Sequence, residues 1–509
     1  MRKISRVLFS RYSVSAIVIL CELLLLAFLA IEAYEYSILA LIIIYAVNAA
    51  VILTLVNRSA NPEYKVSWLL VVMMLPPFGA ILYALFYSRR LTRKEVRMLK
   101  EIKENLSAKG EDENLAALAG VDECAAGKAR AILKDDPIAR VCRNTESVYY
   151  GTGEEMFRDM LRDIEGAERY VFLEYFIIGE GSMWNEIHTL LRRKACEGVE
   201  VRVIYDDIGC MKTLPGRYDR ILKSEGISCR RFEPVTPRVT TSHNNRDHRK
   251  ITVIDGKVAY TGGINIADEY INAIDRFGHW KDGGVRLYGD AAEGLLRQFI
   301  SAWDLCAGEI TSVADYTATD SPALGDGGFY IPFGSGPAPS YDRAAGKGAL
   351  LNLINQAQRY VYITTPYLII DHELTESLCN AVGRGVDVRI ITPAIADKRL
   401  VKLMTKSSYP YLLRAGVRIY EYTPGFIHGK AIVSDDLYAM IGTINLDYRS
   451  LFHHFEDAVW IYGTETVIAA KNDFLSTLDV SKEQDMKRAR LRPTEWLATI
   501  ITKIIAPLL

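Results

Sequence analysis

The chain begins with three long apolar stretches, and a much longer region follows in which short apolar runs alternate with amphipathic ones. In that second region "YVFLEYFII" is followed by "SMWNEIHTLLRRKACEG" and then by "VEVRVIYDD". Runs rich in β-branched and aromatic residues are typical of strands, and the middle segment has the pattern of an amphipathic helix. The alternation therefore predicts βαβ units and a mixed α/β fold.

The α/β region contains an internal duplication. "AERYVFLEYFI" matches "AQRYVYITTPYL", "GVEVRVIYDD" matches "GVDVRIITPA", and "HRKITVID" matches "HGKAIVSD", at offsets that fall smoothly from 190 to 187 to 180 residues. Such a series predicts two similar α/β domains packed about a pseudo-twofold axis. We expect a membrane region at 1–90, a helical connector at 91–135, α/β domains at 136–315 and 316–485, and a basic amphipathic helix at 486–509.

The N-terminal apolar stretches are long enough to cross a bilayer, which requires about 20 residues in a helix. Val14–Ile31 and Ile38–Val56 predict two transmembrane helices, whereas Val66–Tyr87 contains Pro76 and Pro77 and is expected to be re-entrant or interfacial. Basic residues flank this region on both sides, and basic flanks remain in the cytoplasm. We therefore expect a multi-pass membrane protein whose α/β domains lie in the cytoplasm, although an odd number of spans stays open.

The C-terminal segment "KRARLRPTEWLATIITKIIAPLL" joins a basic run to an apolar helix that carries a tryptophan. This pattern predicts a helix lying in the membrane interface, with a helix docked on the protein core as the alternative.

The net charge of −1 argues against nucleic acid as the main partner, because binding phosphates normally requires a basic surface. The eight cysteines are scattered without a CxxC pair, which is typical of reduced thiols and gives no zinc motif. We therefore expect neither a metal nor a cofactor.

The strongest chemical signal is a motif that occurs once in each repeat. His248 and Lys250 lie two residues apart in a strand-like run, as do His428 and Lys430, so each pair projects from one face of its strand. A pseudo-twofold axis can bring both pairs together around one phosphate. Lysines would bind its oxygens, and a histidine can attack phosphorus or protonate a leaving oxygen.

Each motif continues with an aspartate five residues after the lysine, Asp255 in one repeat and Asp435 in the other. These aspartates belong to the candidate catalytic set. Their spacing directs them to the opposite face of the strand, so a role in bracing a turn is an equal alternative.

Further polar residues follow both motifs at matching places. Asn265 and Asn445 stand in "GGIN" and "GTIN", where they can donate hydrogen bonds to a phosphate. Asp282 aligns with Glu456, and a carboxylate in that place can hold an imidazole in one tautomer.

The paired HxKx4D motifs, each followed by Gly-Gly/Thr-x-Asn, resemble those of the phospholipase D superfamily. From its apolar start to "PGFIHGKAIVSDDLYAMIGTINLDYRSLFHHFED", the whole chain resembles the bacterial cardiolipin synthases of that superfamily. The resemblance implies a phosphatidyl-histidine intermediate, with one phosphatidylglycerol as donor and a second as acceptor, and with release of glycerol. Membrane lipids are then the implied partners, and the implied location is the bacterial inner membrane, with the catalytic domains on the cytoplasmic side.

The resemblance also implies individual roles. His248 and His428 would be nucleophile and general acid/base, with His248 favoured as the nucleophile. Glu174 matches a family position and would mark the acceptor side or brace a strand, and the family commonly has asparagine where this chain has His454. The implied phosphate ligands and orienting acids are Lys250, Lys430, Asn265, Asn445, Asp282 and Glu456.

Three alternatives remain open at this point. The protein could be a phospholipase D, or a phosphatidyltransferase that uses phosphatidylethanolamine or CDP-diacylglycerol. It could also be a membrane-tethered phosphodiesterase or nuclease, because phosphodiester cleavage uses the same groups. A non-catalytic lipid-binding scaffold is the third alternative.

Overall fold

A computed structural model describes residues 24, 34–58, 61–86, 93–107, 113–234, 245–318, 324, 327–338 and 340–506. The chain divides into two compact units. One unit comprises Met1–Arg90, Val235–Asn244 and Ile500–Leu509, and the other comprises Leu91–Pro234 and Asn245–Thr499. The larger unit holds both repeats.

The first repeat forms a seven-stranded mixed sheet with the order β1-β8-β6-β5-β2-β3-β4. Its strands β2, β3 and β4 run parallel to one another, and the other neighbours are antiparallel. The strands are β1 Thr145–Tyr150, β2 Tyr170–Tyr175, β3 Glu200–Asp206, β4 Ser228–Phe232, β5 Lys250–Ile254, β6 Val258–Gly262 and β8 Gly284–Gly289.

The second repeat forms an eight-stranded sheet that, read from the opposite edge, has the order β9-β18-β16-β15-β10-β12-β13-β19. The first seven strands match the first sheet one for one, including which neighbours are parallel. The strands are β9 Phe329–Ser335, β10 Tyr360–Thr364, β12 Asp387–Pro393, β13 Arg418–Tyr422, β15 Ala431–Ser434, β16 Tyr438–Gly442, β18 Glu456–Tyr462 and β19 Ser481–Glu483. The predicted duplicated α/β fold is therefore confirmed.

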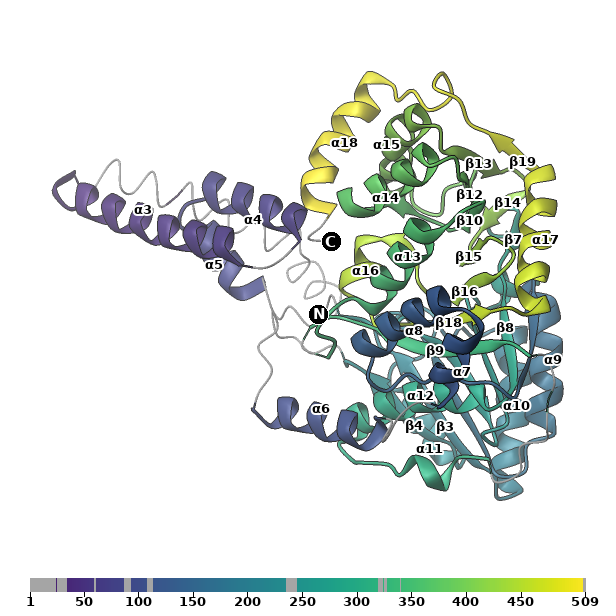
Figure 1. The fold of residues 1–509 in the computed structure, drawn as a ribbon. Coiled ribbons are helices and arrows are strands. Elements are labelled where there is room, and N and C mark those ends of the chain that lie inside the picture. The colour runs from purple at the N-terminus through teal and green to yellow at the C-terminus, as the bar shows by residue number, and fades with distance from the viewer. Residues whose placement is uncertain are drawn as a thin grey trace. The chain divides into compact units, whose positions relative to one another are not determined.

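Helices follow the strands in the same order in both repeats (Figure 1). In the first they are α9 Gly153–Glu165, α10 Ser182–Cys196, α11 Tyr218–Ser224 and α12 Ala291–Ala307; in the second they are α13 Ala345–Gln356, α14 His372–Gly383, α15 Arg399–Ala415 and α17 Glu465–Asp479. The shorter elements are η2 Asp268–Ile271, η3 Val313–Asp315, α16 Tyr448–Phe452, and the strands β7 His279–Lys281, β11 Leu368–Ile369, β14 Gly425–Ile427 and β17 Leu446–Asp447.

One buried core is common to both repeats and contains residues of both sheets, of α12 and of α17. Phe172 of the first sheet stacks on Phe299 of α12 with ring centroids 4.8 Å apart. In the second sheet, Tyr362 stacks on Phe474 of α17 at the same 4.8 Å distance. Because the two sheets share this core, the repeats belong to one compact unit, and a site can form between them.

The predicted connector is helical and packs on the repeats. It contains α6 Arg93–Leu106, α7 Glu113–Val121 and α8 Glu123–Asp135. Leu106 belongs to the core shared by the two sheets, whereas Leu118 and Ile132 belong to the core of the second repeat. The connector is thus held in place by apolar burial along its length.

The N-terminal unit contains one described helix that is long and apolar enough to cross a membrane, over Ile38–Asn57 within α3 Tyr34–Asn57. Its mean hydropathy is 2.7, and it carries none of the charges that would oppose insertion. The expected first span, Val14–Ile31, lies outside the described residues except for Leu24. The third apolar stretch is broken into α4 Pro62–Met74 and α5 Phe78–Phe86, with the two prolines between them.

The C-terminal helix, α18 Pro493–Ile505, carries its apolar side chains outward. Trp496 and Leu497 are each more than half exposed, and Ile500 and Ile504 are exposed on the following turns. Thr499, a small polar residue of the same helix, is buried. An apolar face in contact with solvent is unusual for a helix docked on a core, and it fits the membrane-interface alternative better.

Candidate active site

Two short strand pairings cross between the repeats and position the histidines. In the first, Asp247 bridges Phe455 in parallel, and the His248 amide donates to the Phe455 carbonyl at 2.8 Å. In the second, β14 pairs in parallel with β7, and the His428 amide donates to the Lys281 carbonyl at 2.7 Å. Glu456 follows Phe455, and Asp282 follows Lys281. Each histidine therefore lies beside an acidic residue of the other repeat.

The histidine and acid pairs are consequently exchanged between the repeats. His248 Nδ1 lies 2.9 Å from Glu456 Oε2, and His428 Nδ1 lies 2.6 Å from Asp282 Oδ2. An ionised carboxylate can only accept, so each Nδ1 carries the hydrogen and each Nε2 keeps its lone pair. Both imidazoles are thereby held in the tautomer that can attack phosphorus or take up a proton.

The two acids occupy equivalent positions in the sheets. Gly262 and Gly442 are equivalent motif residues, and they pair with Gly284 and Ala458 in their sheets. Asp282 stands two residues before Gly284, and Glu456 stands two residues before Ala458. The sequence alignment of these two acids is thus reproduced by the strand register.

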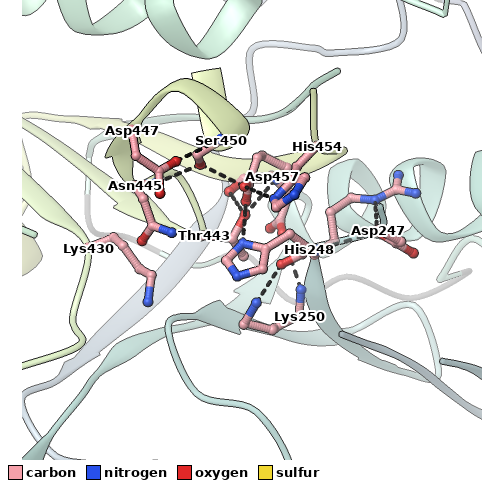
Figure 2. A network of polar contacts seen from close by, with 12 residues as sticks. Asp247, His248, Lys250, Lys430, Thr443, Asn445, Asp447, Ser450, His454 and Asp457 are labelled. Carbon is pink, nitrogen blue, oxygen red and sulfur yellow. Dashed lines mark hydrogen bonds and ion pairs between the residues drawn. The ribbon is translucent and has the colours of Figure 1, made fainter. Parts of the chain in front are cut away.

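Hydroxyl groups fix the Glu456 carboxylate (Figure 2). Ser450 Oγ donates to Oε1 at 2.6 Å, and Thr443 Oγ1 donates to Oε2, which also accepts from His248. Burial would raise the pKa of Glu456, but its contact with His248 lowers that pKa well below the ordinary value. The carboxylate is therefore ionised, and both of its oxygens accept hydrogen bonds.

Asp282 is held by a hydrogen bond from a backbone amide and by close packing against Gly263. The Gly283 amide donates to Oδ1 at 2.9 Å, and a Cβ atom added to Gly263 would lie only 1.9 Å from that oxygen. Only glycine at position 263 permits this close approach. The first glycine pair of the sequence motif therefore makes room for the acid that orients His428.

Both lysines are buried at the site and bond to the backbone of the histidine before them. Lys250 Nζ donates to the His248 carbonyl and Lys430 Nζ to the His428 carbonyl, each at 2.5 Å. The two sides differ in one respect, because Lys430 Nζ also lies against the ring of His428, 2.8 Å from Nδ1 and 3.0 Å from Nε2. The ring nitrogen of His428 thus has a proton source beside it.

Burial dominates the protonation of these four residues. It lowers the pKa of His248 to about 3 and, together with the charge of Lys430, that of His428 to about 4. It also lowers the pKa of Lys250 to about 8 and of Lys430 to about 7. The charge of Lys250 contributes to the lowered pKa of both His428 and Lys430, so the two motifs lie within electrostatic reach of each other.

The two motif asparagines have different surroundings. Asn265 Oδ1 accepts from the Ile177 amide at 3.0 Å, and its Nδ2 donates to the Tyr270 hydroxyl at 2.7 Å. The buried Oδ1 of Asn445 has no hydrogen-bond partner among the described residues. Asn445 is therefore the better placed of the two to rearrange toward a ligand.

Asp255 and Asp435 are not brought to the histidines, and their place in the catalytic set is corrected here. Both have positive φ, 54° and 58°, in the turn after β5 and β15. The Asp255 carboxylate accepts from the amides of residues 168–170, and that of Asp435 from the amides of residues 358–360, at 2.8–3.0 Å. These contacts match the alternative of a braced turn, which holds the start of β2 and β10.

Replacing Asp255 with alanine should therefore lower stability and leave the chemistry intact. Loss of three bonds from backbone amides to a carboxylate should destabilise the fold by about 3 kcal/mol. Asp255→Asn is the matched control, because asparagine tolerates the same backbone conformation and keeps one acceptor oxygen. Thermal inactivation would measure the loss, and a large fall in turnover per folded molecule would contradict the bracing role.

Glu174 is also placed away from the histidines. It pairs with Ile251 in the sheet register, so it lies on the face opposite Lys250. There its carboxylate forms a fully buried ion pair with Arg249 at 2.7 Å, and Arg249 also contacts Asp247. The structure thus supports the strand-bracing alternative for Glu174 and corrects the substrate-side one.

Sequence reasoning did not identify three polar residues of the site. Thr443 and Ser450 hold Glu456, and Asp457 links the repeats by accepting from Thr261 Oγ1 at 2.5 Å. Burial raises the pKa of Asp457 to about 7. All three stand in the segment "GTINLDYRSLFHHFED", but only Thr443 lies within a motif that both repeats share, so its hydroxyl was the available signal.

Comparisons with known proteins agree with this geometry. The family described as "Cardiolipin synthase, PLD-like domain" matches residues 160–275 and 350–478, and "Phospholipase_D-nuclease N-terminal" matches residues 40–86. A cardiolipin synthase of Staphylococcus aureus is 34% identical over 91% of this chain and 94% of its own length. One from Alkalihalophilus pseudofirmus is 33% identical over 89% of this chain and 90% of its own.

The chain belongs to the phospholipase D-type cardiolipin synthase family. A phosphatidylserine synthase from Haemophilus influenzae has a similar fold, with a TM-score of 0.55 and 15% identity over 75% of this chain and 100% of its own. Membership of this family makes the protein a phosphatidyltransferase enzyme.

For a cardiolipin synthase-type site of this kind, the lysine pKa values predict how activity depends on pH. A lysine binds phosphate only in its charged form, which is lost as pH rises through the lowered pKa values of about 7 for Lys430 and about 8 for Lys250. The histidines stay neutral throughout, because their pKa values of about 3 and about 4 lie below the working range. We expect kcat/KM to be flat in weak acid and to fall from about pH 7 upward, first as Lys430 and then as Lys250 loses its charge.

Initial rates at constant ionic strength would test this prediction, with Lys430→Arg as the comparison because arginine keeps its charge. The alkaline limb of that variant should be shallower, whatever its absolute rate. A wild-type kcat/KM that rises through this range would contradict the assignment.

Proposed function

We propose that the protein is a cardiolipin synthase that transfers the phosphatidyl group of one phosphatidylglycerol to a hydroxyl of a second, with release of glycerol. The observation that carries the proposal is the pair of imidazoles, each held by an acid from the other repeat, with two buried lysines beside them. This set supplies two groups for acid–base or nucleophilic work, and positive charge for a phosphodiester.

In the first step His248 Nε2 attacks phosphorus, and the bond from phosphorus to the glycerol oxygen breaks. His428, which is neutral with a lone pair on Nε2, relays to that oxygen a proton from the ammonium of Lys430, so that glycerol leaves and a phosphatidyl group remains on His248. The assignment of the two roles follows their surroundings. Lys430 Nζ lies 2.8 Å from His428 Nδ1 and 3.0 Å from its Nε2, whereas the hydrogen bond of Lys250 Nζ goes to the His248 carbonyl. A ring beside a cationic donor is suited to proton transfer, and one whose Nε2 is not approached by an ammonium is suited to attack.

In the second step a hydroxyl of the acceptor phosphatidylglycerol gives its proton to His428 and attacks phosphorus. The bond between phosphorus and His248 breaks, and the product carries four acyl chains. Lys250, Lys430 and Asn445 would bind the non-bridging oxygens throughout, and Glu456 and Asp282 would stabilise the imidazolium that forms in each step. Every proton taken up in one step is returned in the other.

Membrane attachment is part of the proposal. The candidate span in α3 and the outward apolar face of α18 would keep the enzyme at the bilayer, where its lipid acceptor is concentrated. The basic residues on both flanks of the N-terminal region favour a multi-pass arrangement with the repeats in the cytoplasm.

Purified enzyme given only labelled phosphatidylglycerol would test the function. Release of glycerol together with a lipid of four acyl chains is the expected result. Phosphatidic acid as the main product would identify a phospholipase D, and turnover that requires CDP-diacylglycerol or phosphatidylethanolamine would identify another phosphatidyltransferase.

A further inference from the structure

His454 is a buried imidazole that the proposed reaction does not use. It is 8% exposed, and neither of its ring nitrogens has a hydrogen-bond partner among the described residues. Its ring stands 5.5 Å from that of His248, between centroids, and its Nδ1 lies 3.7 Å from Glu456 Oε1 (Figure 2). Leaving both nitrogens of a buried imidazole unsatisfied is costly, which points to a ligand.

The other repeat has no such group. By the strand register that equates Asp282 with Glu456, the counterpart of His454 is Trp280, whose ring stands 5.4 Å from that of His428. The two half-sites therefore share a skeleton, but only the His248 side presents a second imidazole. The indole N–H of Trp280 is also buried without a hydrogen-bond partner among the described residues, but it can only donate, whereas His454 has a ring nitrogen with a lone pair that can bind a metal ion.

The three side chains of this half-site form a set of metal ligands. One nitrogen each of His248 and His454 and one oxygen of Glu456 lie within 4.8 Å of one another. Two imidazoles and a carboxylate are the ligands that zinc takes in open sites with a fourth position for water. Ser450 and Thr443 fix the carboxylate from outside, as partners of metal ligands commonly do.

We propose that His454, Glu456 and His248 form a zinc-binding site whose occupation reversibly inhibits the enzyme. Zinc would bind His248 at Nδ1 in place of the hydrogen, which moves to Nε2, so no proton is gained or lost. His248 then lacks the lone pair with which it would attack phosphorus. The inhibition rests on the proposed function, whereas the binding does not. Lys250 and Lys430 add positive charge nearby, and so we expect affinity of about 10 µM rather than that of a structural zinc site.

Two separate measurements on the full-length protein in detergent test the proposal. Competition with a zinc-sensitive dye, in the absence of lipid, should give a site that His454→Asn weakens roughly 100-fold. Turnover of wild type should fall about tenfold at ~100 µM zinc and return with a chelator, since occupancy at ten times the dissociation constant is about 90%. His454→Asn should keep its turnover in chelator and be insensitive at that concentration. His453→Asn, the neighbouring histidine, is the matched control and should behave as wild type.

Equal zinc binding and equal inhibition in wild type and His454→Asn would overturn the proposal. Replacing zinc with cobalt gives a coloured complex whose absorption spectrum reports the ligands. A thiolate band in that spectrum would also overturn the proposal, because one of the cysteines would then hold the metal. Failure of the proposed function would give a different result. No cardiolipin would form in the presence of the chelator, but the dye titration would still show the zinc site.

Discussion

Replacing His248 or His428 with alanine is expected to lower turnover by at least ~10⁴-fold, because neither half of a two-step transfer can proceed without nucleophile or acid. The two variants should differ in what remains on the protein. With a phosphatidyl ester of nitrophenol, whose leaving group needs no proton, His428→Ala should form the phosphatidyl-histidine adduct and fail to pass it on. His248→Ala should form no adduct.

Intact-protein mass spectrometry after rapid mixing would detect the adduct by its added mass. Thermal unfolding of both variants, followed by circular dichroism, controls for folding, since each histidine is buried and bonded to the other repeat. An adduct on His248→Ala alone would reverse the two roles. An adduct on neither variant, with both folded, would contradict covalent catalysis.

Much of this arrangement could be predicted from local pattern. Residues two apart on a strand share a face, so the His-x-Lys motifs predicted which side chains project together, and both lysines are found at the histidines. The shrinking offsets predicted a duplication that the matched strand orders reproduce. Turn chemistry was also visible: "VIDGK" places Asp255 before glycine, a turn signal that the structure bears out with a positive φ.

The exchange of acids could not be predicted, because it depends on contacts between repeats. Asp282 follows His248 within one repeat, and nothing in that spacing says that its partner is His428. The pairing arises only when β7 and β14, which lie far apart in sequence, run side by side. The sequence left two interpretations open for Glu174 and gave no role to His454 for a similar reason: whether a buried polar side chain has a hydrogen-bonding neighbour depends on tertiary packing.

The exchanged pairs make the second strong prediction, because each acid should affect the step of the histidine that it holds. Glu456→Gln and Asp282→Asn should each lower turnover by ~10³- to 10⁴-fold, since an amide can donate to Nδ1 and so favour the wrong tautomer. Glu456→Gln removes the support of His248, so the adduct should form slowly. Asp282→Asn weakens His428, so the adduct should form from the nitrophenol ester and persist.

Time courses of adduct formation and decay in the two variants separate this arrangement from one in which each repeat is self-contained. If Asp282 supported His248 of its own repeat, Asp282→Asn would be the variant that forms the adduct slowly, and Glu456→Gln would be the one that accumulates it. A double-mutant cycle adds an independent measure. In the His248→Ala background, adding Glu456→Gln should lower turnover little further. In the background of an unrelated surface substitution, Glu456→Gln should lower turnover by its full amount. Near-additive losses for His248 with Glu456 would mean that the 2.9 Å contact between them does not operate in catalysis.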